Sequence, residues 1–184
     1  MRHALSVLSL ALLACASPPP PHAVDALIGS PGVVTLTNLH PDEPRSRLHA
    51  ANFQQAGLIP VCSEVALLER NKERLVFSVN ATGKRYEYYH HKAAGEPFPD
   101  HLLRYFGTAC PRAQLAALDK LDQEGVKQGK ALPGMTKQGV VFALGYPPPN
   151  VTPSLDADRW IYWTNRFNRR AVVFESGRVL VVED

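Results

Sequence analysis

The sequence lacks the features by which most enzymes and nucleic-acid-binding proteins are recognised. Its formal net charge is only +3 at pH 7, which is too small to indicate nucleic acid as a partner. It contains no Gly-x-Ser-x-Gly elbow, no phosphate-binding loop and no zinc-binding spacing of Cys and His. Beyond the N-terminal segment, no apolar run is long enough to cross a membrane as a helix. We therefore expect neither catalytic residues nor a metal or other cofactor.

Cysteine is also scarce, and the first of the 3 Cys residues closes an apolar N-terminal segment. The segment MRHALSVLSLALLAC has a basic start at Arg2, an apolar stretch too short to span a bilayer, and the small residue Ala14 before Cys15. This pattern predicts a secretory signal peptide. Its last four letters resemble a bacterial lipobox, in which the Cys sulfur is diacylated and the Cys becomes the first mature residue. An ordinary signal peptide that happens to contain Cys is the alternative.

The lipobox resemblance implies a lipoprotein signal peptide over residues 1–14 and a lipid anchor at Cys15. Several acyl chains, at about 0.8 kcal/mol per buried CH₂, make membrane attachment effectively permanent. Ala16 follows the cysteine, at the position where Asp would resemble an inner-membrane retention signal. The resemblance therefore implies the outer membrane of a bacterium, on its periplasmic side. The prolines from Pro18 to Pro21 predict that residues 15–30 are an extended tether unable to join a core.

With Cys15 lipidated, Cys62 and Cys110 are left in an oxidising compartment. We expect them to form a disulfide bond. The sequence does not give the distance between them, so two buried free thiols stay as the alternative.

Residues 31–107 are dominated by short β-type runs, which predict a small β module. The runs are SEVALLER, ERLVFSVN, KRYEYYHH and GVVTLTNLH, and turn-forming residues separate the first three. Within them Leu75, Phe77 and Val79 alternate with other residues, as in a half-buried strand. The stretch LIPVCSEVALLE resembles the entry of a bacterial SH3-like barrel. Two helices, over residues 99–106 and 111–122, are predicted to follow.

Residues 108–184 end in a second pattern, a short capped helix followed by three strands. In GMTKQGVVFALGYPP, Thr136 is placed to cap the helix, Met135 and Val140 are spaced as a hydrophobic staple, and Gly145 ends it. Gly139 departs from the capping box, which would have Glu or Gln there. The runs RWIYW, AVVFE and RVLVVE then predict an antiparallel meander whose last turn is Ser176-Gly177.

These landmarks resemble the SmpA/OmlA domain of BamE-type lipoproteins, which belong to the barrel-assembly machinery of the bacterial outer membrane. The residues that carry the resemblance are Gly134, Met135, Thr136, Leu144, Gly145, Pro147, Trp160 and Tyr162. The resemblance implies two short helices on a three-stranded antiparallel sheet, and a scaffolding role without chemistry. The whole chain is therefore expected to have an α+β fold, with an SH3-like module followed by a BamE-like module.

The same resemblance implies a partner-binding edge around the first strand of the last module. Family contacts with a protein partner and with anionic lipid headgroups correspond here to Pro148, Ile161 and, displaced by one position, Arg166. We expect Trp160 and Ile161 to form one exposed edge together with a basic cluster. That cluster consists of Arg166, Arg169 and Arg170, and its alternative role is that of a solvated hairpin tip.

Catalytic and metal-binding alternatives have little support. His90 and His91 are adjacent, so on a strand they point to opposite faces and cannot share one metal; with His101 they are expected to be surface residues. A Cys nucleophile paired with one of these histidines has no motif behind it. Asp156 and Asp158 could suggest a calcium loop, but they better fit a capped turn before the strand at Trp160.

We therefore expect a non-catalytic outer-membrane lipoprotein that acts as a binding or scaffolding module in envelope assembly or maintenance. Its expected partners are the membrane, through the anchor, and an envelope protein, with barrel-assembly components and anionic headgroups as candidates. The alternatives are a periplasmic ligand-sensing or inhibitor-type binding protein and, third, a cell-wall hydrolase.

Overall fold

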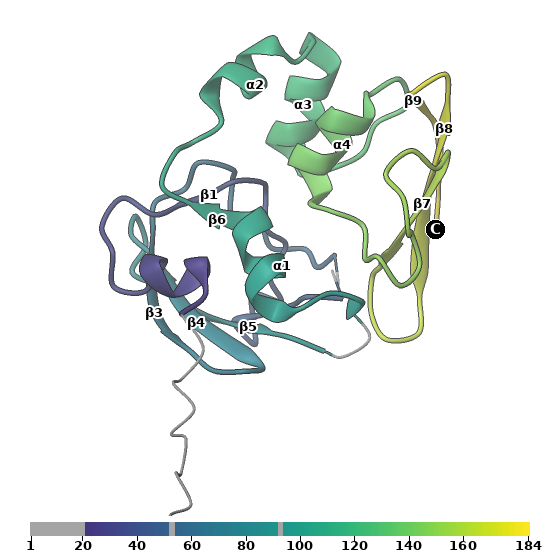
Figure 1. Ribbon diagram of the computed structural model, residues 1–184. Coiled ribbons are helices and arrows are strands. Elements are labelled where there is room, and N and C mark those ends of the chain that lie inside the picture. Colours follow the sequence, from purple (N-terminus) through teal and green to yellow (C-terminus); the bar gives the residue numbers. More distant parts are fainter. Residues whose placement is uncertain (1–20, 52–53, 92–93) are drawn as a thin grey trace, which may run out of the picture.

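The computed structural model describes residues 21–51, 54–91 and 94–184 (Figure 1). The predicted signal peptide, the lipidation site at Cys15 and Pro18 to Pro20 lie outside these residues. Helices and sheets are mixed along the chain, which confirms the predicted α+β class. Within the described ranges, no helix is long and apolar enough to cross a membrane. Two separate buried clusters form, so we call residues 21–110 the N-terminal module and residues 111–184 the C-terminal module.

The N-terminal module contains a four-stranded sheet of order β2-β5-β4-β3. Three antiparallel strands form the predicted meander: β3 (Val65–Arg70), β4 (Arg74–Val79) and β5 (Arg85–Tyr89). Leu75, Phe77 and Val79 are buried and the residues between them are partly exposed, as the alternation predicts. The fourth strand, β2 (Arg47–His49), runs parallel to β5 and was too short for its sequence to indicate it.

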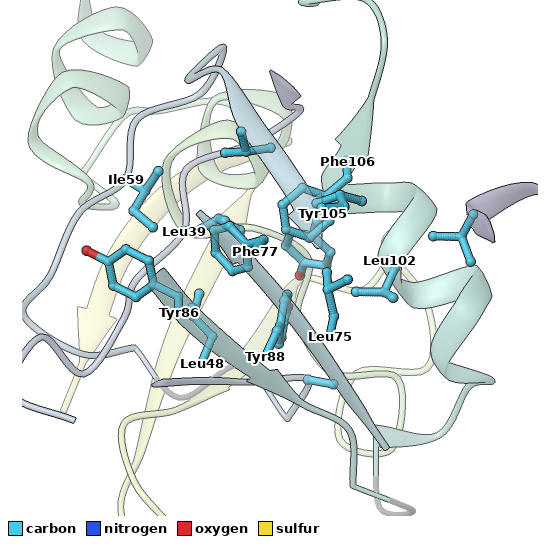
Figure 2. Close-up of a cluster of buried hydrophobic side chains, with 14 of the residues drawn as sticks. Leu39, Leu48, Ile59, Leu75, Phe77, Tyr86, Tyr88, Leu102, Tyr105 and Phe106 are labelled. Atoms are coloured by element: carbon cyan, nitrogen blue, oxygen red, sulfur yellow. The ribbon is translucent and has the colours of Figure 1, made fainter. Parts of the chain in front are cut away.

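Helix α1 (Phe98–Tyr105) packs its apolar side chains against this sheet (Figure 2). Leu102 and Tyr105 lie on one side of the helix and join Phe77 and Tyr88 in the core. Burying side chains of this size contributes about 2 kcal/mol each. The helix was predicted one residue later, and it ends at Tyr105 because Phe106 leaves it to enter a strand.

A second, two-stranded sheet pairs β1 (Val34–Thr35) with β6 (Phe106–Gly107). The run GVVTLTNLH was expected to form a longer strand, but its backbone changes partner along the run. Leu36 N–H donates to Tyr105 O at 2.9 Å, which extends the pairing of β1 with β6 by one bond. Asn38 N–H then donates to Phe142 O at 2.9 Å, and Leu39 pairs with Ile59 in an isolated antiparallel bridge.

The predicted tether is shorter than residues 15–30, because its second half belongs to the N-terminal module. The 3₁₀ helix η1 (Ala23–Leu27) inserts Val24, which is fully buried, into the core. Gly29 N–H donates to Leu67 O at 2.9 Å, which fixes the chain beside β3. Of the apolar residues after the proline run, Val24 belongs to the core, and Leu27 and Ile28 pack against it.

Cys62 and Cys110 are joined in a disulfide bond with their Cα atoms 5.0 Å apart. Cys62 lies in the turn before β3, with φ of 65°, and its N–H donates to Thr35 O at 2.8 Å. Cys110 lies just after β6. The bond therefore ties the end of the N-terminal module back to its own sheet.

The C-terminal module begins with two helices where one was predicted over residues 111–122. They are α2 (Arg112–Ala117) and α3 (Lys120–Gln128). The helix is interrupted between them, because Leu118 has an extended backbone. Asp119 then caps the second helix by accepting a hydrogen bond from Asp122 N–H at 2.9 Å. Leu118 is buried, as predicted, whereas Leu115 is only partly so.

Helix α4 (Lys137–Leu144) is the short helix that the sequence indicates, and it lies against the three-stranded sheet (Figure 1). The antiparallel strands are β7 (Arg159–Trp163), β8 (Arg169–Glu175) and β9 (Arg178–Glu183). Ser176 and Gly177 both have positive φ, at 51° and 76°, so the turn between β8 and β9 is the tight hairpin expected.

Candidate functional site

The two faces of the C-terminal sheet differ, and the difference corrects the predicted binding edge. Trp160 and Tyr162 point toward α4 and are 1 % and 0 % exposed. The Trp160 and Phe174 rings are in contact, with centroids 4.7 Å apart and planes tilted by 59°. Pro148 is buried as well. Trp160 and Pro148 are therefore not on an exposed edge as predicted, because strand alternation places Trp160 in the core.

The opposite face of the sheet, which we call the outer sheet face, consists of Ile161, Trp163, Ala171, Val173 and Val181, of which Ala171 is itself buried. Cross-strand pairing places them in adjacent rows, with Ile161 opposite Ala171 and Val173 opposite Val181. Val181 is 40 % exposed, and Leu180 beside it is 56 % exposed. Charged residues border the face, where Arg159 pairs with Glu183 at 2.6 Å. Ile161 is the one predicted apolar contact residue that lies here, and it is half-buried.

The three predicted arginines lie at one end of the sheet but have different surroundings. Arg166 is exposed at the loop tip, 4.7 Å from the ring centroid of Phe167, which is 75 % exposed. Arg169 is exposed and lies 5.4 Å from the Trp163 ring. Arg170 is partly buried and pairs with Asp184. Arg166 and Arg169 thus face solvent beside the outer sheet face, and Arg170 is already neutralised.

The start of α4 explains the glycine that breaks the capping box. Thr136 Oγ1 accepts from Gly139 N–H at 3.0 Å, as predicted for the N-cap. The Thr136 N–H, which a Glu at position 139 would satisfy, donates instead to Asp122 Oδ1 of α3 at 2.8 Å. A Cβ at Gly139 would overlap that carboxylate. Asp122 therefore supplies the missing half of the box from another helix.

The end of α4 is completed by the other module. A helix leaves its last four carbonyls without intrahelical donors. Here Gly145 N–H donates to Val141 O at 2.8 Å, and Asn38 N–H donates to Phe142 O at 2.9 Å. The remaining two carbonyls accept from side chains of the N-terminal module.

These side chains are amide and imidazole donors. Asn38 Nδ2 and His40 Nε2 donate to Ala143 O at 3.3 and 2.8 Å, and Gln54 Nε2 donates to Leu144 O at 2.6 Å. Asn38 is 1 % exposed and also donates to Val126 O of α3 at 2.6 Å. Burial lowers the pKa of His40, so its imidazole is held neutral. The short helix is thus the joint between the modules.

A cavity of about 660 Å³ opens beside this joint. Both modules and the linker between them form its walls: Leu36, Thr37, Leu103, Arg104, Pro111, Gln114, Lys137, Gln138, Val141, Phe142, Tyr146, Leu155, Asp156 and Trp160. The indole N–H of Trp160 is buried and has no acceptor among the residues that the structure describes. A buried donor without an acceptor is costly and uncommon.

The histidines do not form a metal site in the described parts of the chain, where no group of three or more potential ligands occurs. His101 was expected at the surface but is 3 % exposed. Its Nδ1 lies 2.7 Å from Glu96 Oε1 and its Nε2 lies 2.7 Å from the Tyr88 hydroxyl. Burial lowers the pKa of His101 against the opposing effect of Glu96. Both ring nitrogens are occupied by structural bonds.

Asp156 and Asp158 are exposed in the loop before β7. Lys137 Nζ donates to Asp156 O at 2.7 Å and lies 3.5 Å from Asp158 Oδ1. Asp156 N–H donates to Ser154 Oγ at 3.0 Å, as in the capped turn that the sequence predicts.

Comparison with known proteins assigns no relative: no family model, no curated protein and no solved structure matches the chain. What the chain can bind must therefore be argued from its own residues. The joint and the cavity leave no local pattern in the sequence, because each combines residues from separate segments; Asn38 and Ala143 of the joint are 105 positions apart. The departure of Gly139 from the capping box reflects a different contact, that with Asp122 of the same module.

Proposed function

We propose that this protein is a non-catalytic, exported lipoprotein that binds another envelope protein through the outer sheet face. The observation that carries the proposal is the apolar surface on that face: Ile161, Trp163 and Val173 are half-buried and Val181 is 40 % exposed. An apolar centre with a charged rim, here Arg159, Arg169 and Glu183, is the usual composition of a protein–protein interface.

The resemblance to SmpA/OmlA domains supports the proposal through the order of elements. Helices α3 and α4 contact each other and precede a three-stranded antiparallel sheet, which agrees with the arrangement expected of that family. For the N-terminal module, the β3–β4–β5 meander favours the SH3-like interpretation, whereas the parallel pairing of β2 with β5 departs from an all-antiparallel barrel.

The lipid anchor is tested by fractionation of cells that express the full chain. Cys15→Ser should move the protein from the membrane fraction to the soluble periplasm, because the acylated sulfur is lost. The wild-type chain and an Ala16→Ser chain, which keeps the Cys, serve as controls. Unchanged membrane association of Cys15→Ser would contradict a lipid anchor.

The binding face is tested by placing a photo-crosslinking amino acid at Val181 in the lipidated protein within its own bacterium. The matched control is Leu68 of the N-terminal module, which is 38 % exposed against 40 % for Val181. We expect a discrete protein adduct from Val181 and none from Leu68, since proximity to a bound partner is required. Equal labelling at both positions, or no adduct at Val181, would remove the outer sheet face as the binding surface.

A further inference from the structure

We propose that the second half of strand β9 is a docking site where an extended segment of the partner protein joins the C-terminal sheet as a fourth strand. The inference rests on the proposed function and goes beyond it, because it states which backbone groups hold the partner and in which conformation the partner binds. We call residues 180–183 the open edge of the sheet.

Both outer edges of the four-stranded sheet in the N-terminal module are bonded to other parts of the chain. On β2, Arg47 N–H donates to Asp42 O at 3.2 Å, and Arg47 O accepts from Asp42 N–H at 2.8 Å. On β3, Leu67 O accepts from Gly29 N–H at 2.9 Å. An uncovered edge strand offers its unpaired N–H and C=O groups to a strand of another chain, and these contacts use such groups within the module.

The same holds for β7, one of the two outer strands of the C-terminal sheet. Ile161 N–H donates to Thr152 Oγ1 at 2.9 Å, and Trp163 O accepts from Gln54 N–H at 2.8 Å. These two backbone groups point away from β8, so neither is left for an added strand.

The outer edge of β9 is covered only at its start. Gly134 N–H donates to Val179 O at 2.7 Å, and Val179 N–H donates to Met135 O at 2.8 Å. In the part of the chain that the structure describes, no group from outside the sheet bonds to the backbone of residues 180–183. The open edge therefore differs from the outer edges of β2, β3 and β7.

The bonds of β8 show which groups point outward at the open edge. Phe174 N–H donates to Asp158 O, just before β7, at 2.7 Å. Val172 lies two residues earlier on the same strand, so its backbone groups face β7 as well. Val182 pairs with Val172, and its own N–H and C=O therefore point away from β8 to the open edge. A donor and an acceptor on one extended residue match the backbone of another extended chain.

The side chains of the open edge are apolar at its centre. Leu180 is 56 % exposed and Val181 is 40 % exposed, and neither Lys nor Pro, which commonly protect edge strands, occurs in β9. Val181 also belongs to the outer sheet face, so an added strand widens that face. The segment that fits is extended and carries an apolar side chain beside Val181.

A second copy of this chain fits the open edge less well. A two-fold pairing of β9 with β9, centred on the outward-facing Val182, places Val181 opposite Glu183 of the other copy. The same pairing places Leu180 opposite Asp184 of the other copy. Apolar side chains would then lie across from carboxylates, whereas a partner segment with apolar residues gives matched cross-strand pairs.

The test removes the outward N–H of Val182 in the lipidated protein that carries the photo-crosslinking amino acid at Val181. Val182→Pro deletes this donor without breaking a bond to β8, and we expect the yield of the partner adduct to fall about ten-fold, as for loss of one hydrogen bond. The matched control is Val182→Ala, which shortens the side chain but keeps the N–H, and its yield should stay close to that of the parent protein.

A second variant keeps the test valid if Val182→Pro does not fold, which circular dichroism reveals. Leu180→Lys places a charge on the open edge at a side chain that is 56 % exposed, so it should lower the adduct yield without unfolding the module. Leu155→Lys, at a position 43 % exposed in the loop before β7, is its control and should leave the yield unchanged.

The outcomes separate this inference from the proposed function. An adduct whose yield is the same in the folded Val182→Pro and Val182→Ala proteins, or in the Leu180→Lys and Leu155→Lys proteins, would overturn strand addition and leave the outer sheet face as the binding surface. No adduct in the parent protein would contradict the proposed function and this inference together. An adduct with the mass of two copies of the chain would overturn the partner segment in favour of self-pairing.

Discussion

The two modules are stabilised by different chemistry. All 7 histidines of the chain precede residue 102, and both cysteines of the described residues lie in the N-terminal module. The C-terminal module contains neither, and its elements approach closely at glycines: Gly125 against Met135, and Gly139 against Asp122. We therefore expect the N-terminal module to be sensitive to pH and to reductant, and the C-terminal module to any side chain added at its contacts. Five experiments test this contrast.

The largest expected effect is loss of the disulfide. The double variant Cys62→Ala/Cys110→Ala opens a loop with a sequence separation of 48 residues, which the loop-entropy model values at about 4 kcal/mol. Native-state hydrogen exchange should show loss of protection in β3–β5 and little change in β7–β9. Equal loss in both modules would mean that they unfold as one unit.

The next effect is expected at Gly145, whose φ of 77° and ψ of −175° are nearly restricted to glycine. A Cβ there would also lie 2.9 Å from Tyr105 Cε1 in the N-terminal module. Gly145→Ala should cost about 3 kcal/mol, measured by urea unfolding. Gly177 has a similar φ of 76° with no neighbour within 4 Å, so Gly177→Ala reports the backbone cost alone, about 1 kcal/mol. Equal costs would show that Tyr105 moves aside freely.

Asn38→Ala tests the joint and should cost about 2 kcal/mol, because it leaves the N–H of Val61 without its acceptor and removes one donor each from the carbonyls of Val126 and Ala143. Its signature is loss of hydrogen-exchange protection on both sides of the joint, in α3 and α4 and in the turn at Val61, whose N–H donates to Asn38 Oδ1 at 2.8 Å. Asn150→Ala, at an exposed position, is the control. A local effect in one module alone would contradict a shared joint.

Acidification should destabilise the N-terminal module selectively. Burial lowers the pKa of His40, His49 and His101 below the ordinary value of about 6.5, so the folded state holds them neutral while the unfolded state takes up protons first. Their contribution is complete above that pH and is lost as the pH falls through the lowered pKa values. Protection factors corrected for intrinsic exchange, compared at pH 7.5 and 5.5, should fall in β2–β5 and stay level in β7–β9. A fall in β7–β9 with no change in β2–β5 would contradict the assignment of the pH dependence to these histidines.

The smallest effect is expected at the loop tip. Arg166→Glu should change the free energy of unfolding by less than about 0.5 kcal/mol, because the side chain is exposed and lies against the exposed Phe167 ring. Thermal unfolding checks this prediction. A melting temperature lower by several degrees would mean that Arg166 contributes to the stability of the fold.

Local patterns were sufficient where neighbouring residues decide the structure. Alternation predicted β4, and the Ser176-Gly177 turn predicted the hairpin of β8 and β9, because each depends on a few consecutive residues. The N-cap at Thr136 and the staple of Met135 with Val140, both in the second core, were predicted for the same reason.

Sequence reasoning failed where a partner comes from far along the chain. Asp122 completes the cap of α4 from another helix, and Asn38 completes its end from another module, so neither role leaves a local pattern. The predicted edge combined Trp160 with Ile161, although successive strand residues face opposite ways, so only Ile161 lies on the outer sheet face. The cavity depends on both modules and could not be predicted from either.

The dependence of α4 on Asn38, His40 and Gln54 means that the order in which the two modules are made affects folding. Residues 21–110 are made before α4 and, in an exported chain, also delivered before it, so the N-terminal module can fold first and present its donors to the helix. A circular permutant that begins at residue 111 would reverse this order and make α4 before its acceptors have donors. The N-terminal module would then supply its donors only after α4 has been made. We expect the permutant to refold more slowly, although its final contacts are the same.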